Sequence, residues 1–170
     1  ALLKNDKAGM LTFSKKVEKI VAASNKRTHI NTINEALYNI DTQFTDSDFG
    51  YLYATIKRKV TQRSLLILYT NFEHISALKR QLPFLKAISR QHLLVTVFFE
   101  NTELDDLIKE NVEDLQSIYH KTIAEKFAYE KRLIVKELEN RGVHAILTKP
   151  QNLTVNVINK YLEFKAKGLI

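Results

Sequence analysis

The pattern of apolar and polar residues divides the chain near residue 64. Before that point, two short apolar runs, 8–14 and 17–23, are separated by a brief polar link, which predicts an antiparallel β-hairpin. Apolar residues then recur at helical spacing over 29–40 and again over 49–60, which predicts two amphipathic helices.

From residue 64 onward, apolar runs alternate with helical segments. The runs 64–70, 93–99 and 143–147 are continuously apolar, as is typical of strands that are buried on both faces of a parallel sheet. A β-α-β-α-β-α order of this kind predicts right-handed crossovers and helices on both faces of the sheet. The helical segments are 73–90, 102–140 and the stretch from 152 onward.

Two residue types predict where these helices break or end. Pro83 lies inside the first helical segment and is expected to kink or divide it. One continuous helix over 102–140 would be about 60 Å long, which is too long for a small domain, so we expect a break near Asn111. The same segment is expected to end at Gly142, because glycine suits the position after the last helical turn.

The composition is that of one globular domain spanning 1–170, with 45% hydrophobic and 26% charged residues. The chain has no Cys, which excludes a disulfide, a zinc–thiolate site and a cysteine nucleophile. No stretch reaches the roughly 18 apolar residues that are needed to cross a bilayer. Since the first residue is Ala1 and not Met, we expect an N-terminal part to be missing, and any membrane anchor would lie there.

The formal net charge is +7, a mild basic excess that would favour an acidic partner. Lys57, Arg58, Lys59 and Arg63 form a basic cluster just before the first buried strand. One interpretation is a patch that contacts phosphate or RNA, and the other is a solvated helix face. Acidic residues interspersed through most helices favour the second interpretation.

No motif for catalysis or cofactor binding is present. The four Gly are far apart, so the dinucleotide fingerprint and the P-loop are absent, and there is no GxSxG elbow. The five His include no pair at the i, i+4 spacing of a helical metal site. Asp41, Asp46 and Asp48 fit either a divalent-ion loop or helix capping. The EF-hand pattern is not met, which favours capping, with Thr45 as N-cap and Asp48 at N3. We therefore expect no enzymatic activity.

In doubly wound sheets, ligands bind beyond the carboxyl ends of the strands. Three such tips are available, at 70–73, 100–102 and 148–150, and the loop 25–31 is expected to join them. These tips are the best candidate site in the chain, although polar residues at strand ends are also ordinary caps.

The order of the elements and three stretches, 5–14, 63–71 and 161–168, resemble a known family. The chain is similar, over nearly its whole length, to the bacterial domain-of-unknown-function family 58, which has a von Willebrand factor A-like fold. The resemblance implies a Rossmann-like, mostly parallel α/β sheet with an antiparallel edge hairpin and helices on both faces. The first strand of that fold would precede Ala1 and is therefore missing.

The resemblance also implies a degenerate ion site. Three ligands of the family's divalent ion belong to the missing strand. The fourth corresponds to Asn31, and the fifth corresponds to Asn71, which follows Thr70. Asparagine offers a neutral carbonyl where a hard cation prefers a carboxylate. We expect no tightly bound ion and no cofactor in this chain.

The missing strand would lie in the middle of the sheet. Its absence would leave the strands at 8–14 and 64–70 with unpaired inner edges, which invites strand exchange or a homo-oligomer. We expect either that the two edges close together or that another chain fills the gap.

The function implied by the resemblance is that of a non-enzymatic adaptor. It would work with a MoxR-type AAA ATPase in complex assembly or maturation, on the cytoplasmic side and possibly tethered to the inner membrane. The alternative is a basic nucleic-acid-binding module that uses the cluster at residues 57–63. The expected contact face of the adaptor consists of Thr28, Thr70, Asn71, Glu73 and Asn101.

Overall fold

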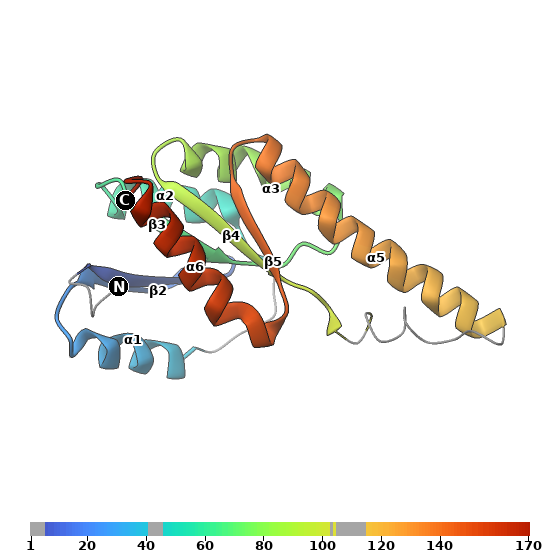
Figure 1. Ribbon diagram of the computed structural model, residues 1–170. Coiled ribbons are helices and arrows are strands. Elements are labelled where there is room, and N and C mark those ends of the chain that lie inside the picture. Colours follow the sequence, from blue (N-terminus) through green and yellow to red (C-terminus); the bar gives the residue numbers. More distant parts are fainter. Residues whose placement is uncertain (1–5, 41–45, 103, 105–114) are drawn as a thin grey trace. The chain divides into compact units, whose positions relative to one another are not determined.

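The chain divides into two compact units, residues 1–61 and 62–170, each with its own β-sheet (Figure 1). The single domain expected over 1–170 stays a prediction. The computed structural model describes residues 6–40, 46–102, 104 and 115–170.

The first unit contains the antiparallel hairpin that the two apolar runs predict. Its strands are β1 (Ala8–Phe13) and β2 (Val17–Ser24). Gly9 lies where the two backbones approach closely, because a Cβ atom at this position would be 2.8 Å from the carbonyl oxygen of Val21. Any other residue at this position would push the strands apart.

Two helices, α1 (His29–Tyr38) and α2 (Phe49–Lys59), pack against β2. The side chain of Asp48 caps α2 by accepting a hydrogen bond from the backbone N–H of Tyr51 at 2.8 Å. The prediction that Asp48 lies at N3 is therefore wrong, since Asp48 is itself the N-cap. The expected cap, Thr45, lies outside the described residues.

Packing in the first unit centres on the start of α2. The rings of Phe13 and Phe49 meet edge to face, with centroids 5.4 Å apart and an interplanar angle of 85°. The backbone N–H of Asp48 donates to the carbonyl of Ser14 at 2.8 Å. The end of β1 is thereby joined to the beginning of α2.

The second unit contains a three-stranded parallel sheet with the order β3-β4-β5. The strands are β3 (Leu65–Tyr69), β4 (Leu93–Phe99) and β5 (His144–Thr148). The central strand β4 is buried except at its last residue, as predicted. The prediction that β3 is buried on both faces is wrong, because Ile67 is 37% exposed and Tyr69 is 53% exposed. In the sheet that the structure describes, β3 pairs with β4 alone and lies at the edge.

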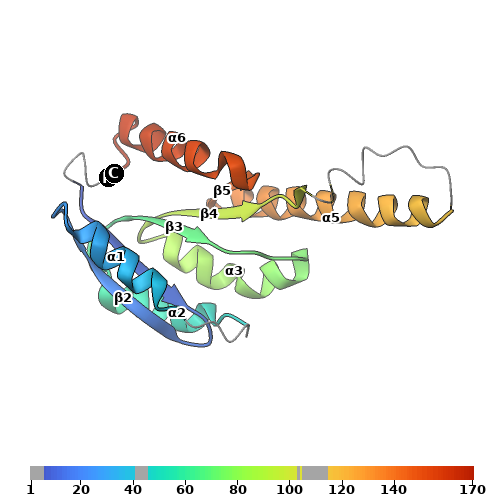
Figure 2. The same ribbon diagram turned by 90° about the horizontal axis from the view of Figure 1, so that it is seen from below.

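Helices lie on both faces of this sheet, as the alternating pattern predicts. Figure 2 shows α6 (Leu153–Ala166) on one face and α3 (Ile75–Ser89) on the other, and α5 (Leu115–Asn140) packs against α3 and β5. A short 3-10 turn, Pro150–Asn152, leads into α6. The second unit is thus an α/β structure with three layers, while the finer von Willebrand factor A-like arrangement stays a prediction.

The helix boundaries confirm one expectation and correct another. Pro83 was expected to kink or divide the helix; α3 runs unbroken through it, so a division does not occur, while a kink stays a prediction. After α5, Gly142 has a φ of 77°, and its N–H donates to the carbonyl of Glu139. The N–H of Val143 donates to the carbonyl of Leu138, which completes a Schellman motif and confirms the predicted end. The break expected near Asn111 lies outside the described residues.

Both faces of the sheet carry a tightly packed core. On the α6 face, Leu93, Val95 and Val97 of β4 pack with Phe164. The alternate residues of β4 face the other way, toward α3 and α5. The described residues of α3 and α5 that are almost completely buried are Leu78, Leu85, Ile88, Ala124, Ile134 and Leu138.

Candidate functional site

A cleft of about 660 Å³ lies at the carboxyl ends of β3 and β4, where the sequence predicts a site. Three of the predicted residues, Asn71, Glu73 and Asn101, line it, and Thr70 directly precedes Asn71. The remaining lining residues come from the end of β4, from β5 and from one side of α5. These residues are Phe99, Glu100, Thr102, Leu104, Phe127, Ala128, Lys131, Arg132 and Leu147.

Lys131 of α5 fixes one wall of this cleft. Its ammonium group donates to the side-chain oxygen of Asn71 and to the backbone carbonyl of Phe72, the latter at 2.8 Å. Burial lowers the pKa of Lys131, and the nearby carboxylate of Glu73 partly opposes that shift. The turn after β3 is thereby joined to a helix that lies about sixty residues further along the chain.

Sequence reasoning missed Lys131, although a signal is present. Ala124, Ala128, Lys131 and Leu138 recur at helical spacing, so Lys131 lies in the row that faces the core. A lysine in an otherwise apolar helical row points to a partner for its charge, because an unpaired buried charge is costly.

A carboxylate of α5 caps the neighbouring helix α3. Oε2 of Glu130 accepts a hydrogen bond from the backbone N–H of Ile75 at 3.2 Å and lies 3.3 Å from Nδ1 of His74. The ring of His74 stacks on Phe127, with centroids 5.9 Å apart. These contacts hold α3 and α5 together beside the cleft. The His74 ring and the Glu130 carboxylate therefore have a structural role there.

The cleft combines aromatic and charged groups of both signs. Phe99 is 39% exposed and Phe127 is 36% exposed, so part of each ring is open to solvent. Among the described residues that line the cleft, the charged ones are two acids, Glu73 and Glu100, and two bases, Lys131 and Arg132. The formal charges of these four residues cancel, so the described part of the lining carries both signs in equal number.

The positions of the degenerate ion site fall in different units. Asn31 lies in α1 of the first unit and is exposed, and its N–H donates to the carbonyl of Thr28 at 3.0 Å. The side-chain oxygen of Asn71, in the second unit, accepts a hydrogen bond from the ammonium of Lys131. The expectation that Asn31 and Thr28 lie in one site with the ends of the parallel strands stays a prediction. Among the residues that the structure describes, no three His, Cys, Asp or Glu side chains form a group that could hold a metal ion.

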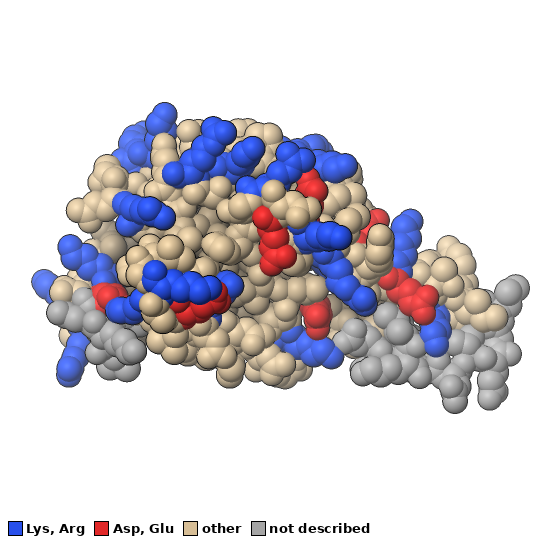
Figure 3. All heavy atoms as spheres, turned by 45° about the horizontal axis from the view of Figure 1, so that its top comes forward, with Lys and Arg blue, Asp and Glu red and all other residues tan. Residues whose placement is uncertain are grey.

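The basic cluster is also divided between the units. Lys57, Arg58 and Lys59 occupy the last turn of α2, where positive charge complements the helix dipole, whereas Arg63 belongs to the second unit. On the face shown in Figure 3, Lys and Arg are spread among acidic and neutral residues. Within the described ranges, none of the helices has the length and apolar character needed to cross a membrane.

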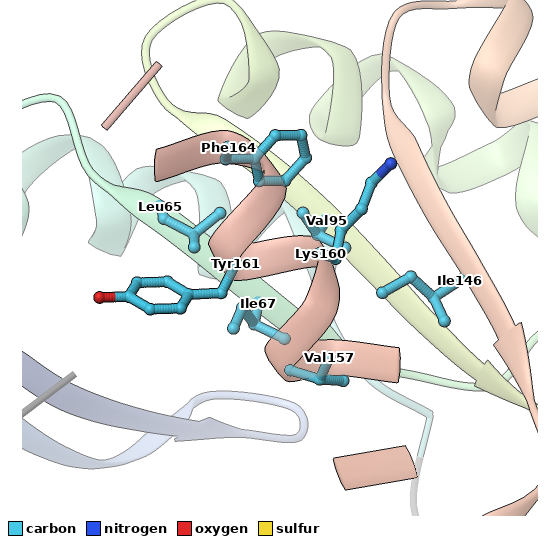
Figure 4. A pocket seen from close by; sticks show the side chains of 8 residues that line it. All are labelled: Leu65, Ile67, Val95, Ile146, Val157, Lys160, Tyr161 and Phe164. Carbon is cyan, nitrogen blue, oxygen red and sulfur yellow. The ribbon is translucent and has the colours of Figure 1, made fainter. Parts of the chain in front are cut away.

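A narrow gap between α6 and the sheet is part of the core packing (Figure 4). It has no room for a molecule as large as water, and its walls are mostly apolar. At its rim, the ammonium of Lys160 lies 5.2 Å from the centre of the Phe164 ring. Hydrogen bonds from Lys160 and Lys167 lower the pKa of Glu163 to about 2. This cluster is a surface ion-pair network that stabilises the end of α6.

No protein-family model matches the chain, and neither a curated protein nor a solved structure shows significant similarity to it. The structure itself places the chain in the α/β class. It has a three-stranded parallel sheet flanked by helices and a separate two-stranded antiparallel sheet.

Proposed function

We propose that this chain is a protein-interaction domain without enzymatic activity, and that it binds its partner in the cleft beyond β3 and β4. The observation that carries the proposal is the mixed lining of the cleft, in which partly exposed aromatic rings lie among acidic and basic side chains of the described residues. Aromatic residues and arginine are enriched in protein interfaces, where they form the anchoring contacts.

Four side chains of the cleft have defined roles in this proposal. Phe99 and Phe127 offer apolar surface to a side chain of the partner. Arg132 is exposed on α5 and suits a carboxylate, which it can bind with two parallel hydrogen bonds. Lys131 is a positioning residue, because its ammonium already holds the turn at Asn71.

The proposed partner is a MoxR-type AAA ATPase, with which the chain would act as an adaptor in complex assembly or maturation. This choice rests on the resemblance to the bacterial domain-of-unknown-function family 58. A place on the cytoplasmic side of the inner membrane, with a tether outside this chain, rests on the same resemblance.

The test uses the full-length protein as bait in its native lysate, at two salt concentrations, with mass spectrometry of the captured proteins. A captured AAA ATPase is then purified and titrated against the wild type, Arg132→Glu and Lys136→Glu. Lys136 is the matched control, because it is an exposed base one turn further along α5 and does not line the cleft. We expect Arg132→Glu to raise Kd at least about tenfold and Lys136→Glu to leave it within about twofold.

Two results would contradict the proposal. If Arg132→Glu and Lys136→Glu bind the ATPase with equal affinity, the partner does not contact the cleft. Captured nucleic acid that is released at higher salt, and is lost when Lys57, Arg58 and Lys59 are neutralised, would favour the nucleic-acid-binding alternative.

A further inference from the structure

The main-chain hydrogen bonds of β3 show which of its groups point away from the sheet. The carbonyl of Ser64 accepts from the N–H of Leu93 at 3.0 Å, and the N–H of Thr70 donates to the carbonyl of Val97 at 3.2 Å. In a strand, the N–H and C=O of one residue point to the same side, and the side alternates along the chain. The even-numbered residues of β3 therefore bond to β4.

It follows that Leu65, Ile67 and Tyr69 direct their N–H and C=O groups toward the open side of β3. This side is an edge of the three-stranded sheet. The strand contains no charged residue and no proline, which are the usual devices that protect an edge from pairing with another strand. Among the described residues no strand pairs with this edge, so its main-chain groups can accept a further strand.

Apolar side chains continue the surface around this edge. Ile67 and Tyr69 are partly exposed on the face that α6 covers. Figure 4 shows the ring of Tyr161 from α6 pointing past Leu65 and away from Val95. A strand added at the edge would cover this apolar surface as well as satisfy the outward main-chain groups.

We propose that two copies of this chain pair through β3, antiparallel, about a two-fold axis that passes beside Ile67. Ile67 then lies opposite Ile67 of the second copy, and Leu65 lies opposite Tyr69. Each of these is a hydrogen-bonded pair that exchanges two main-chain bonds, so every outward group of β3 is satisfied. The two three-stranded sheets become one continuous sheet with an isologous interface.

The symmetry and charge of the strand favour a second copy in this orientation. Reversal about Ile67 exchanges Leu65 and Tyr69, so all three outward residues of one strand find an apolar outward residue of the other. Antiparallel pairing about Ile67 brings Arg63, which precedes the strand, opposite Asn71 of the second copy and within two residues of its Glu73. Parallel pairing would place Arg63 beside Arg63, and like charges on neighbouring strands repel.

Cysteine cross-linking tests the register directly, because the chain has no cysteine of its own. In Ile67→Cys, the two Cα atoms should lie about 5.5 Å apart, within reach of a short thiol cross-linker. In Tyr69→Cys, the equivalent atoms should be more than about 13 Å apart, so this variant should link only when mixed with Leu65→Cys. Ile158→Cys, at an exposed apolar position on α6, is the matched control.

Sedimentation velocity measures the dimer without any cross-linker. We expect the wild type to dimerise with rising concentration, and we expect Ile67→Lys to weaken dimerisation at least about tenfold by placing two charges at the axis. Ile158→Lys should dimerise like the wild type. Circular dichroism checks that each variant keeps the native helix content.

Three outcomes would overturn the proposal. One is a wild-type chain that stays monomeric at every accessible concentration, since an extended segment of a different protein, or closure within the chain, would then cover the edge. Another is equal cross-linking of the Ile67→Cys and Ile158→Cys variants. The third is self-linking of Tyr69→Cys as efficient as that of Ile67→Cys, which indicates association without a defined register.

Discussion

Replacing Lys131 by methionine should destabilise the second unit, because it removes the ammonium that joins α5 to the turn after β3. The ammonium donates to the side chain of Asn71 and to the carbonyl of Phe72. Methionine keeps most of the apolar length of the side chain, so the loss is mainly that of the two hydrogen bonds.

The expected loss is about 1–2 kcal/mol. A hydrogen bond from a charged donor contributes about 1.5–3 kcal/mol when it is shielded from water. Lys131 is only partly buried, so water replaces part of each interaction and the pair contributes less than twice that amount. A loss of this size lowers Tm by roughly 3–6 °C for a chain of this length.

Urea unfolding, followed by circular dichroism, measures the change as a lower midpoint with an unchanged slope. Arg132→Met is the matched control, because Arg132 is the next residue on the same helix and is exposed. This control should change stability by less than about 0.5 kcal/mol. Equal midpoints for Lys131→Met and Arg132→Met would refute the anchoring role of Lys131.

Three further predictions concern the core and the titratable groups. Leu85→Ala should cost about 2–5 kcal/mol in thermal or urea unfolding, because Leu85 is completely buried, whereas Leu162→Ala on the exposed side of α6 should cost far less; similar losses would contradict the core assignment. Glu163 has a pKa of about 2, below its ordinary value of 4.5, so its stabilising effect is present above about pH 4.5 and is lost as the pH falls toward 2. The difference in Tm between the wild type and Glu163→Gln should therefore vanish on acidification, and a difference that stays constant down to pH 2 would be inconsistent with that ion pair. Burial lowers the pKa of His92 from 6.5, and neither ring nitrogen has a hydrogen-bond partner among the described residues, so the unfolded chain binds a proton more readily and stability falls as the pH drops below about 6.5. His92→Leu should lose less Tm than the wild type between pH 7 and pH 5, and an unchanged acid sensitivity would count against this reasoning.

The sequence alone was sufficient to predict a helix or strand where its apolar residues recur with the period of that element and one face of it is buried. The hairpin, the central strand β4 and the helices that follow the parallel strands all appear where the apolar pattern predicts them. Gly142 was predictable as a helix end, because the positive φ of a Schellman motif favours glycine over other residues. The carboxyl ends of the strands were predictable as the place of the cleft, because all parallel strands of a sheet end at the same edge.

Only the tertiary structure decided which residues meet in the cleft. Glu73 and Asn101 were expected there, but Lys131 was not, because its position depends on how α5 lies against the turn after β3. Pro83 was expected to kink or divide a helix, and the helix is not divided there. Packing of the buried residues on both sides of a proline can maintain a helix that local propensity alone would interrupt.

The apolar run of β3 illustrates the same limit. Its residues are as uniformly apolar as those of β4, so the sequence predicts burial on both faces for both strands. Whether a strand is central or lies at an edge is decided by which strands pair with it, and pairing joins segments that are far apart in the chain. The edge position of β3 therefore follows from the order of the strands, whereas the apolar character of its residues was determined by the sequence.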